Sequence, residues 1–167
     1  MIHFSDTATN QAREARRPST AWNLFPIGCI QHRMKSAKPF PSFSLLLPDD
    51  IQADSDSSVA SYWKQDDTCL LQLSSFVRKS VPQISAIQRL KDRMRAGGEW
   101  QAVRLVRTIE GCEIAAASTK DQDDTSWVHV YLVWDLLAVH ATVSHKGQSS
   151  TCDWAWDALF SIRPVVM

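Results

Sequence analysis

The sequence predicts an α+β fold, in which an antiparallel sheet carries two main helices in the order β-β-β-α-β-β-β-β-α. Three observations indicate this class. Residues 40–77 and 99–144 contain short runs of strand-forming residues separated by polar turns. Residues 80–98 and 150–162 instead repeat their apolar side chains at the spacing of a helix. Several strands on either side of a helix are typical of α+β proteins rather than of alternating parallel units.

Length and composition indicate one globular domain. A chain of 167 residues, 44% of them hydrophobic, can bury one sizeable core and seldom two. Residues 1–35 lack a helix or strand period and carry five basic and two acidic side chains, against 13 basic and 16 acidic in the remainder. We therefore expect residues 1–35 to be a disordered arm or an over-long start. Residues 36–167 should form the α+β domain.

Three strands are predicted before the first helix. The first occupies residues 40–48 and lies at an edge or at the beginning of the sheet, because prolines bound it. Residues 49–58 are acidic and rich in serine, which predicts a loop. Two further strands follow, over residues 58–64 and 68–77.

The first helix is predicted between Ser80 and Gly97. Ser80 is a suitable N-cap, and Gln83 stands three residues later, at the position of a capping box. Gly97 and Gly98 end the helix, because glycine tolerates the left-handed conformation there. The apolar side of the helix consists of Ile84, Ile87, Leu90 and Met94. The basic residues on its other sides are typical of a solvated surface, so we predict no nucleic-acid binding.

The second half of the chain is predicted to hold two hairpins and a last helix. The hairpins cover residues 99–118 and 127–144, and the second of them lies at the centre of the sheet. Ser150 or Thr151 begins a helix that extends over residues 153–162. The polar residues of this helix form a single row, so we expect it to be largely buried.

We expect the central hairpin to turn at Asp135 and Leu136, or through a four-residue loop over residues 134–137 that keeps the same faces. Side chains then alternate between two faces of the sheet. One face is apolar and should face the core; it holds Val128, Val130, Leu132, Trp134, Leu137, Val139, Ala141 and Val143. The other, which we call the mixed face, pairs Trp127 with Ser144, His129 with Thr142, Tyr131 with His140 and Val133 with Ala138.

The mixed face brings together three candidate functional side chains, His129, Tyr131 and His140. Two imidazoles and a phenol can move a proton or bind a metal ion or a small ligand. A metal site needs a third good ligand, which the sequence does not place there, so we predict no bound metal. The alternative is that these side chains pack against a helix or lie half-exposed beside Thr142 and Ser144.

Motifs for cofactors and catalysis are absent from the sequence. Five glycines leave no dinucleotide-binding or phosphate-binding loop, and there is neither a nucleophile elbow nor an H-E-x-x-H pair. The segment Asp121-Gln-Asp-Asp124 lacks the glycine and the bidentate glutamate of a calcium loop, which favours a solvated turn. Cys69 and Cys112 stand in apolar patterns that predict buried thiols. We predict no cofactor, and we favour a protein without catalytic activity.

Three segments carry a resemblance to a known fold. They are Phe43-Ser-Leu-Leu-Leu-Pro48, residues 127–143 of the central hairpin, and Trp156-Asp-Ala-Leu-Phe-Ser-Ile162. Over residues 38–163 their order resembles the PsbP-like fold. Small bacterial proteins with these traits include some that resemble immunity proteins of toxin systems and others that resemble effector chaperones of type VI secretion. The resemblance implies a protein that binds other macromolecules without catalysing a reaction.

The sequence leaves three functional hypotheses. The favoured one is a non-catalytic, cytoplasmic binding protein, such as an immunity protein, a chaperone or an adaptor. Its acidic turn, with Asp121, Asp123 and Asp124, would attract a basic segment of a protein partner. The second is a small-ligand-binding protein or enzyme that uses the histidines and tyrosine of the mixed face. The third is an exported protein that is lipid-anchored through Cys29. We predict no transmembrane segment.

Overall fold

The described part of the chain folds as two antiparallel sheets and two helices, which confirms the predicted α+β class. The computed structural model describes residues 33–65, 68–98, 100, 105–109, 111–121, 123–146 and 152–165, with residues 105–107 and 109 described by their backbone alone. All of them belong to the unit His32–Met167. Cys29 and most of the predicted arm over residues 1–35 lie outside the described residues.

Ten strands and two helices follow one another along these described residues. Five strands precede the first helix: β1 (Met34–Phe40), β2 (Phe43–Pro48), β3 (Gln52–Ser55), β4 (Ala60–Trp63) and β5 (Cys69–Val77). Helix α1 (Ala86–Arg95) is followed by β6 (Leu105–Ile109), β7 (Cys112–Lys120), β8 (Thr125–Val133) and β9 (Leu137–Lys146). Helix α2 (Asp153–Phe160) and the short strand β10 (Arg163–Pro164) come last.

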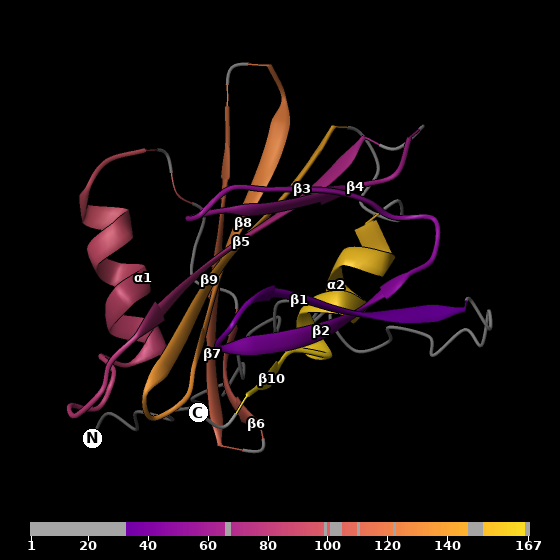
Figure 1. Cartoon of the computed structure of the whole chain (residues 1–167). Helices are drawn as coiled ribbons and strands as arrows, with labels where there is room; N and C mark the ends of the chain where they lie inside the picture. Colours follow the sequence, from indigo (N-terminus) through magenta and orange to yellow (C-terminus); the bar gives the residue numbers. More distant parts are fainter. Residues whose placement is uncertain are drawn as a thin grey trace, which may run out of the picture. The chain divides into compact units, whose positions relative to one another are not determined.

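The strands form a larger and a smaller sheet (Figure 1). The larger sheet has the order β3-β4-β5-β9-β8-β7-β6, and the smaller one has the order β1-β2-β10. Within the larger sheet, the pair of β5 and β9 is the one that joins strands far apart in the sequence. It extends from Cys69↔His145 to Val77↔Leu137. This pair therefore connects the strands that precede α1 with the strands that follow it.

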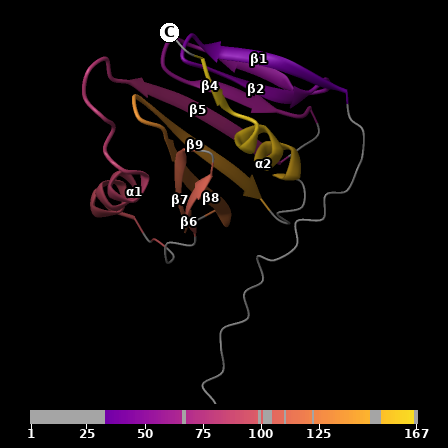
Figure 2. The ribbon, with the colours of Figure 1, turned by 90° about the horizontal axis from the view of Figure 1, so that it is seen from below.

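The two faces of the larger sheet are covered by different elements (Figure 2). The smaller sheet and α2 lie on one side of it, and α1 lies on the other. The larger core, between the two sheets and α2, includes the fully buried side chains Phe43, Leu47, Leu71, Leu73, Val139, Val143, Leu159 and Ile162. Each such side chain contributes about 1.5–3 kcal/mol on burial, so this core is the main source of stability.

The register predicted for the central hairpin is confirmed. Trp134 donates a backbone hydrogen bond of 2.8 Å to the carbonyl of Leu137 across the turn. All the predicted pairs between β8 and β9 are present, including His129↔Thr142. The apolar face lies in the larger core, as its alternation predicts, and part of the mixed face lies under α1.

Helix α1 covers the mixed face over β7, β8 and the turn end of β9. Small side chains on these strands, Ala115, Ala117 and Ala138, allow the helix to approach the sheet closely. Ala86 and Leu90 of the helix are buried there, at 1% and 0% exposure. Further along this face, His140 and Thr142 on β9 and Gln72 and Ser74 on β5 are only half-buried. The mixed face is thus divided into a covered part and an open part.

Two strands differ from the predicted pattern. Residues 40–48, predicted as one edge strand, hold the end of β1, a turn and the whole of β2, and β2 is the middle strand of the smaller sheet because it pairs with both β1 and β10. The loop predicted over residues 49–58 contains β3, whose four residues are all exposed. The larger part of β1 is also exposed. Edge strands that are solvated on both faces have no apolar alternation, so no pattern in the sequence marks them.

Helix α1 begins later than predicted. Its first residue is Ala86 and its N-cap is Ser85, rather than Ser80. The hydroxyl of Ser85 accepts a hydrogen bond from the backbone N–H of Gln88 at 3.3 Å. This is the bond that an N-cap serine makes to one of the first helical N–H groups. The prediction of Ser80 as the N-cap is therefore wrong.

The late start of α1 has a tertiary cause. The backbone N–H of Gln83 donates to the carbonyl of Asp135 at 2.7 Å, and its side chain donates to the carbonyl of Leu136 at 2.8 Å. Gln83 therefore binds the turn of the central hairpin instead of forming a capping box, which holds the chain before Ser85 out of the helix. The predicted end is confirmed, since Gly97 has a positive φ of 116° directly after the C-cap residue.

We expect Ser85→Ala to lower the free energy of unfolding by about 1 kcal/mol, because it removes the N-cap hydrogen bond of α1. Ser80→Ala, in the segment before the helix, should change it by less than about 0.5 kcal/mol. Urea unfolding followed by circular dichroism measures both. Equal losses in the two variants would contradict the assignment of Ser85 as the cap.

Helix α2 is buried on one side only, which corrects the prediction of a largely buried helix. Trp154, Ala155, Ala158 and Leu159 are buried, whereas Phe160 is 44% exposed. The helix packs on β2 and β5 with its buried side, and among the described residues its outer side carries the half-buried Trp156 and the exposed Phe160. The N-cap is Cys152, without a side-chain hydrogen bond. The two predicted caps, residues 150 and 151, lie outside the described residues.

Cys69 and Cys112 are buried, as their apolar surroundings predict. Burial raises the pKa of the Cys112 thiol to about 11, so this thiol is protonated at neutral pH. Neither of the two helices in the described ranges has the length and apolar character needed to cross a bilayer.

Candidate functional site

The pairing of β5 with β9 extends the mixed face of the central hairpin by one strand. Two cross-strand rows result, Gln72–Thr142–His129 and Ser74–His140–Tyr131. The rows are two residues apart along each strand, so their side chains project from the same side of the sheet. Polar groups from three strands therefore gather at one place, although the strands that carry them are distant in sequence.

The three side chains that the sequence singled out are in contact. Nδ1 of His129 lies 3.3 Å from Nε2 of His140, and the two rings are nearly parallel, with an angle of 7° between their planes. The ring of Tyr131 stacks on that of His140, with 4.6 Å between the centroids. The two nitrogens share a hydrogen bond in which one ring donates and the other accepts.

Burial keeps both histidines neutral. It lowers the pKa of His129 to about 4, and the positive charge of Arg93 contributes further. It also lowers the pKa of His140 to about 4, with His129 and then Arg93 as the smaller causes. The same burial raises the pKa of Tyr131. An imidazole with so low a pKa is a weak base, so this pair is better suited to hydrogen bonding than to general base catalysis.

An open groove of about 390 Å³ lies over the half-buried part of the mixed face, beside α1. Its volume falls in the range of about 300–1,000 Å³ that is typical of small-molecule sites. Polar and aromatic side chains line most of it, namely Gln72, Ser74, Arg93, Trp127, His129, His140 and Thr142. The groove thus combines an indole wall with hydroxyl, amide, imidazole and guanidinium groups.

The C-terminal end of α1 is held beside the histidines by Trp100. The indole Nε1 of Trp100 donates to the carbonyl of Gly97 at 2.9 Å, and its ring lies 5.0 Å from that of His129. A Cβ atom on Gly98 would lie 3.1 Å from the same Nε1, and the φ of Gly98 is 111°, so glycine is required here. This packing holds the C-terminal end of α1, and hence Arg93, beside the groove.

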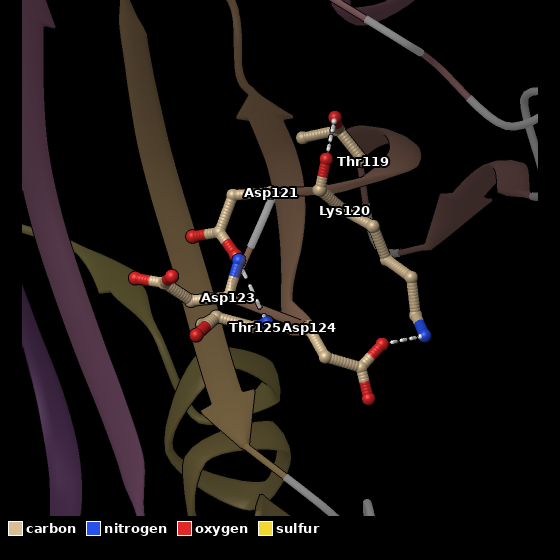
Figure 3. Close-up of polar contacts among 6 residues, drawn as sticks. All are labelled: Thr119, Lys120, Asp121, Asp123, Asp124 and Thr125. Carbon is tan, nitrogen blue, oxygen red and sulfur yellow. Dashed lines mark hydrogen bonds and ion pairs between the residues drawn. The ribbon is translucent and has the colours of Figure 1, made fainter.

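The sequence predicts the acidic turn between β7 and β8 as a partner surface. Hydrogen bonds and an ion pair within this turn balance part of its negative charge (Figure 3). The Asp121 carboxylate accepts hydrogen bonds from the backbone N–H groups of Asp123 at 3.1 Å and Thr125 at 3.0 Å. Lys120 forms an ion pair with Asp124. The hydrogen bond from Lys120, followed by its positive charge, lowers the pKa of Asp124. A role of this turn in partner binding stays a prediction.

Asp121 connects the acidic turn to the groove. Its second carboxylate oxygen accepts a hydrogen bond of 3.0 Å from the indole Nε1 of Trp127, and this bond is the largest cause of the lowered pKa of Asp121. Because Trp127 lines the groove, Asp121 positions the aromatic wall. One residue of the predicted partner surface is therefore linked to the predicted functional face.

We expect protein purified without chelators to contain no stoichiometric zinc, copper or iron. His129 and His140 supply two nitrogens that already bind each other, and no group of three or more candidate ligands is found among the residues that the structure describes. Elemental analysis of the purified protein tests this. About one metal ion per chain, lost in His140→Ala, would show that the pair is part of a metal site.

Sequence reasoning found the histidines and the tyrosine but missed the opposite side of the groove. Gln72 and Ser74 alternate with the buried Leu71 and Leu73, which marks them as outward-facing residues of a strand. That alternation does not say which strand lies beside β5. Arg93 is one of the basic residues that the sequence predicts to lie on a solvated helix face, since no local signal indicates what the C-terminal turn of a helix lies against.

The fold and the groove define a class: an α+β protein of two antiparallel sheets with a ligand-sized groove on one of them. The crystal structure of a protein from Bacteroides thetaiotaomicron VPI-5482 is similar, with a TM-score of 0.58 and 15% sequence identity. The match covers 82% of this chain and 50% of that chain, so this chain spans half the length of its neighbour. At this identity the similarity shows the fold alone. No family model matches the chain, and neither does any curated protein.

Proposed function

We propose that this domain is a small-ligand-binding protein and that its ligand lies in the groove beside α1. The observation that carries the proposal is the convergence of polar groups from β5, β8 and β9 on one open groove of about 390 Å³. A few polar groups in a groove with an aromatic wall are typical of sites that orient a small molecule.

Binding without catalysis agrees best with the chemistry of this groove. The two imidazoles are weak bases, because burial lowers the pKa of each to about 4. Ser74 and Thr142 are the hydroxyl side chains among the lining residues, and the nearest imidazoles are occupied with each other. A serine or threonine nucleophile needs an adjacent base to activate it. We therefore favour a protein that holds its ligand unchanged.

A fragment screen observed through the histidines tests the proposal. Fragments that bind the groove should shift the ¹H–¹³C NMR signals of the His129 and His140 imidazole rings. Thr142→Phe fills the groove and should weaken the binding of these fragments at least tenfold, whereas Ser36→Phe, on exposed β1, should leave it unchanged. Gln72→Leu, which keeps the size of the side chain but removes its amide, serves as a second variant if Thr142→Phe unfolds. A screen without histidine shifts, or binding that these variants do not weaken, would refute the proposal.

A protein partner, the function that the sequence analysis favours, is our second proposal. Five large apolar side chains at one end of the larger sheet are exposed: Phe76, Val77, Val81, Ile84 and Leu136. The segment after β5 is tied to the central turn there, since the backbone N–H of Arg78 donates to the carbonyl of Leu136 at 2.9 Å. Exposed apolar side chains that gather in this way are typical of protein contact sites. The resemblance to PsbP-like proteins supports the same function by analogy.

The charges around this apolar end select one kind of partner. Arg78 and Lys79 follow directly after β5, and the guanidinium of Arg89 lies 5.5 Å from the centroid of the Phe76 ring. Basic groups beside apolar side chains favour an acidic protein segment that carries apolar residues of its own.

Affinity capture from the native host should recover such a protein. Ile84→Asp and Lys79→Glu should release it, whereas Thr142→Phe should retain it. Retention by Ile84→Asp, or capture of no protein, would refute this second proposal.

A further inference from the structure

The charge of the groove is carried by one side chain, Arg93. Among the described residues that line the groove, none is acidic, and the imidazoles and hydroxyl groups are neutral. We infer that the groove binds a small organic carboxylate, whose charged group lies at Arg93 and whose flat body lies against Trp127. This inference rests on the ligand-binding function proposed above and names the class of ligand.

Arg93 is available for an anion, in contrast to its neighbour on the helix. The guanidinium of Arg95 forms an ion pair with Asp92 at 3.3 Å. Arg93 is exposed and takes part in no ion pair within the described ranges of the chain. Its charge acts on the groove, since it disfavours protonation of both His129 and His140. A guanidinium presents two parallel N–H groups, which match the two oxygens of a carboxylate.

The neutral groups beside Arg93 can donate the remaining hydrogen bonds. In the neutral pair of His129 and His140, one N–H lies between the rings, so whichever tautomers are present, one outer N–H remains as a donor. The amide of Gln72 uses one N–H for the hydroxyl of Ser61, at 3.3 Å, and keeps the other. Thr142 adds a hydroxyl between them. These donors suit a singly charged oxygen ligand.

The same geometry argues against a phosphate. Phosphate sites commonly use the N-terminus of a helix or a glycine-rich loop, where several backbone N–H groups and a positive dipole face the anion. Here Arg93 lies in the last turn of α1, so the helix presents the negative end of its dipole. A group with two negative charges would meet one guanidinium and this unfavourable field. A carboxylate meets the same field with a single charge, which one guanidinium balances, and its two planar oxygens match the N–H groups of Arg93.

The aromatic wall selects the body of the ligand. The indole of Trp127 is held by the 3.0 Å hydrogen bond from its Nε1 to Asp121, so its ring keeps a fixed orientation at the groove. A flat ring or an unsaturated chain can lie on this surface, which favours aromatic carboxylates over short aliphatic ones. Asp121 is therefore a positioning residue for the ligand.

Four simple probes of different charge test the inference: benzoate, its neutral isostere benzamide, the benzylammonium cation and inorganic phosphate. In NMR titrations of the full chain at pH 7, benzoate should shift the signals of His129 and His140 and bind at least tenfold more tightly than the other three. Arg93→Gln should weaken benzoate at least tenfold and leave benzamide unchanged. The matched control Arg95→Gln, two residues further along the same helix, should retain the wild-type affinity for benzoate.

The outcomes separate the ligand class from the function on which it rests. Equal binding of benzamide and benzoate in the groove would overturn the carboxylate but leave a ligand-binding groove. Preferential binding of phosphate or of benzylammonium would also overturn it. If no probe shifts the histidines while the fragment screen finds groove ligands without a carboxylate, the inference fails and the proposed function stands. If neither experiment finds a groove ligand, both fail.

Discussion

Leu132→Ala is expected to lower the free energy of unfolding by about 2–5 kcal/mol, because it opens a cavity in the larger core. Leu132 is 3% exposed and lies on the apolar face of the central hairpin, opposite Val139 on β9 and Ile114 on β7. All three side chains belong to the same buried cluster. Urea denaturation at pH 7 measures the change, and the slope of the transition shows whether unfolding remains cooperative.

Thr142→Ala provides the matched control on the opposite face of the same hairpin. Thr142 is half-buried at the groove, so its loss should cost less than about 1 kcal/mol. The contrast between the two variants tests the assignment of the two faces, which positions the candidate site. Equal costs, or a larger cost for Thr142→Ala, would contradict it.

Acidification from pH 7 to pH 4.5 is expected to destabilise the protein through His129 and His140. Both have a pKa of about 4 in the folded protein, against an ordinary value of 6.5. Between these values the unfolded chain binds protons that the folded protein does not. Stability is therefore complete above pH 6.5 and falls as the pH decreases toward 4. The free energy of unfolding decreases by at most about 1.4 kcal/mol per pH unit for each imidazole, and solvent near the open groove makes the decrease smaller.

Urea unfolding at pH 7, 6, 5 and 4.5 measures this dependence. The double variant His129→Gln/His140→Gln should flatten the curve between pH 6.5 and 4.5. Asp121 and Asp124 have lowered pKa values, so their contribution is lost at lower pH, below about 4. A wild-type curve that is flat over this range would show that the two imidazoles are not shielded from water.

The elements of the second half could be predicted because their patterns are local. The central hairpin alternates a fully apolar face with a mixed one, and a shift of one residue would exchange them, so its register is strongly specified. The end of α1 could be predicted from Gly97 and Gly98, because few other residues adopt a positive φ readily. The alternation of side chains along the central hairpin also places His129, Tyr131 and His140 on one face, so they could be grouped without any knowledge of the tertiary structure.

Local pattern failed where an element is defined by what it touches. β3 is exposed along its length and is a strand because it pairs with β4. α1 starts at Ser85 and not at Ser80, because Gln83 is bound to the turn of the central hairpin. In both cases the deciding contact is made with a segment outside the element, so the residues of the element carry no signal of it.

The groove shows the division most clearly. Its histidines, threonine and tryptophan belong to one hairpin, and alternation alone assigns them to one face. Gln72 and Ser74 join them only because β5 pairs with β9, across a long stretch of chain that contains α1 and three further strands. Arg93 joins them because Trp100 holds the end of α1 beside His129. Pairing and packing between distant segments depend on the free energy of the whole fold, and for this reason the tertiary structure alone decided that a polar face became a binding groove.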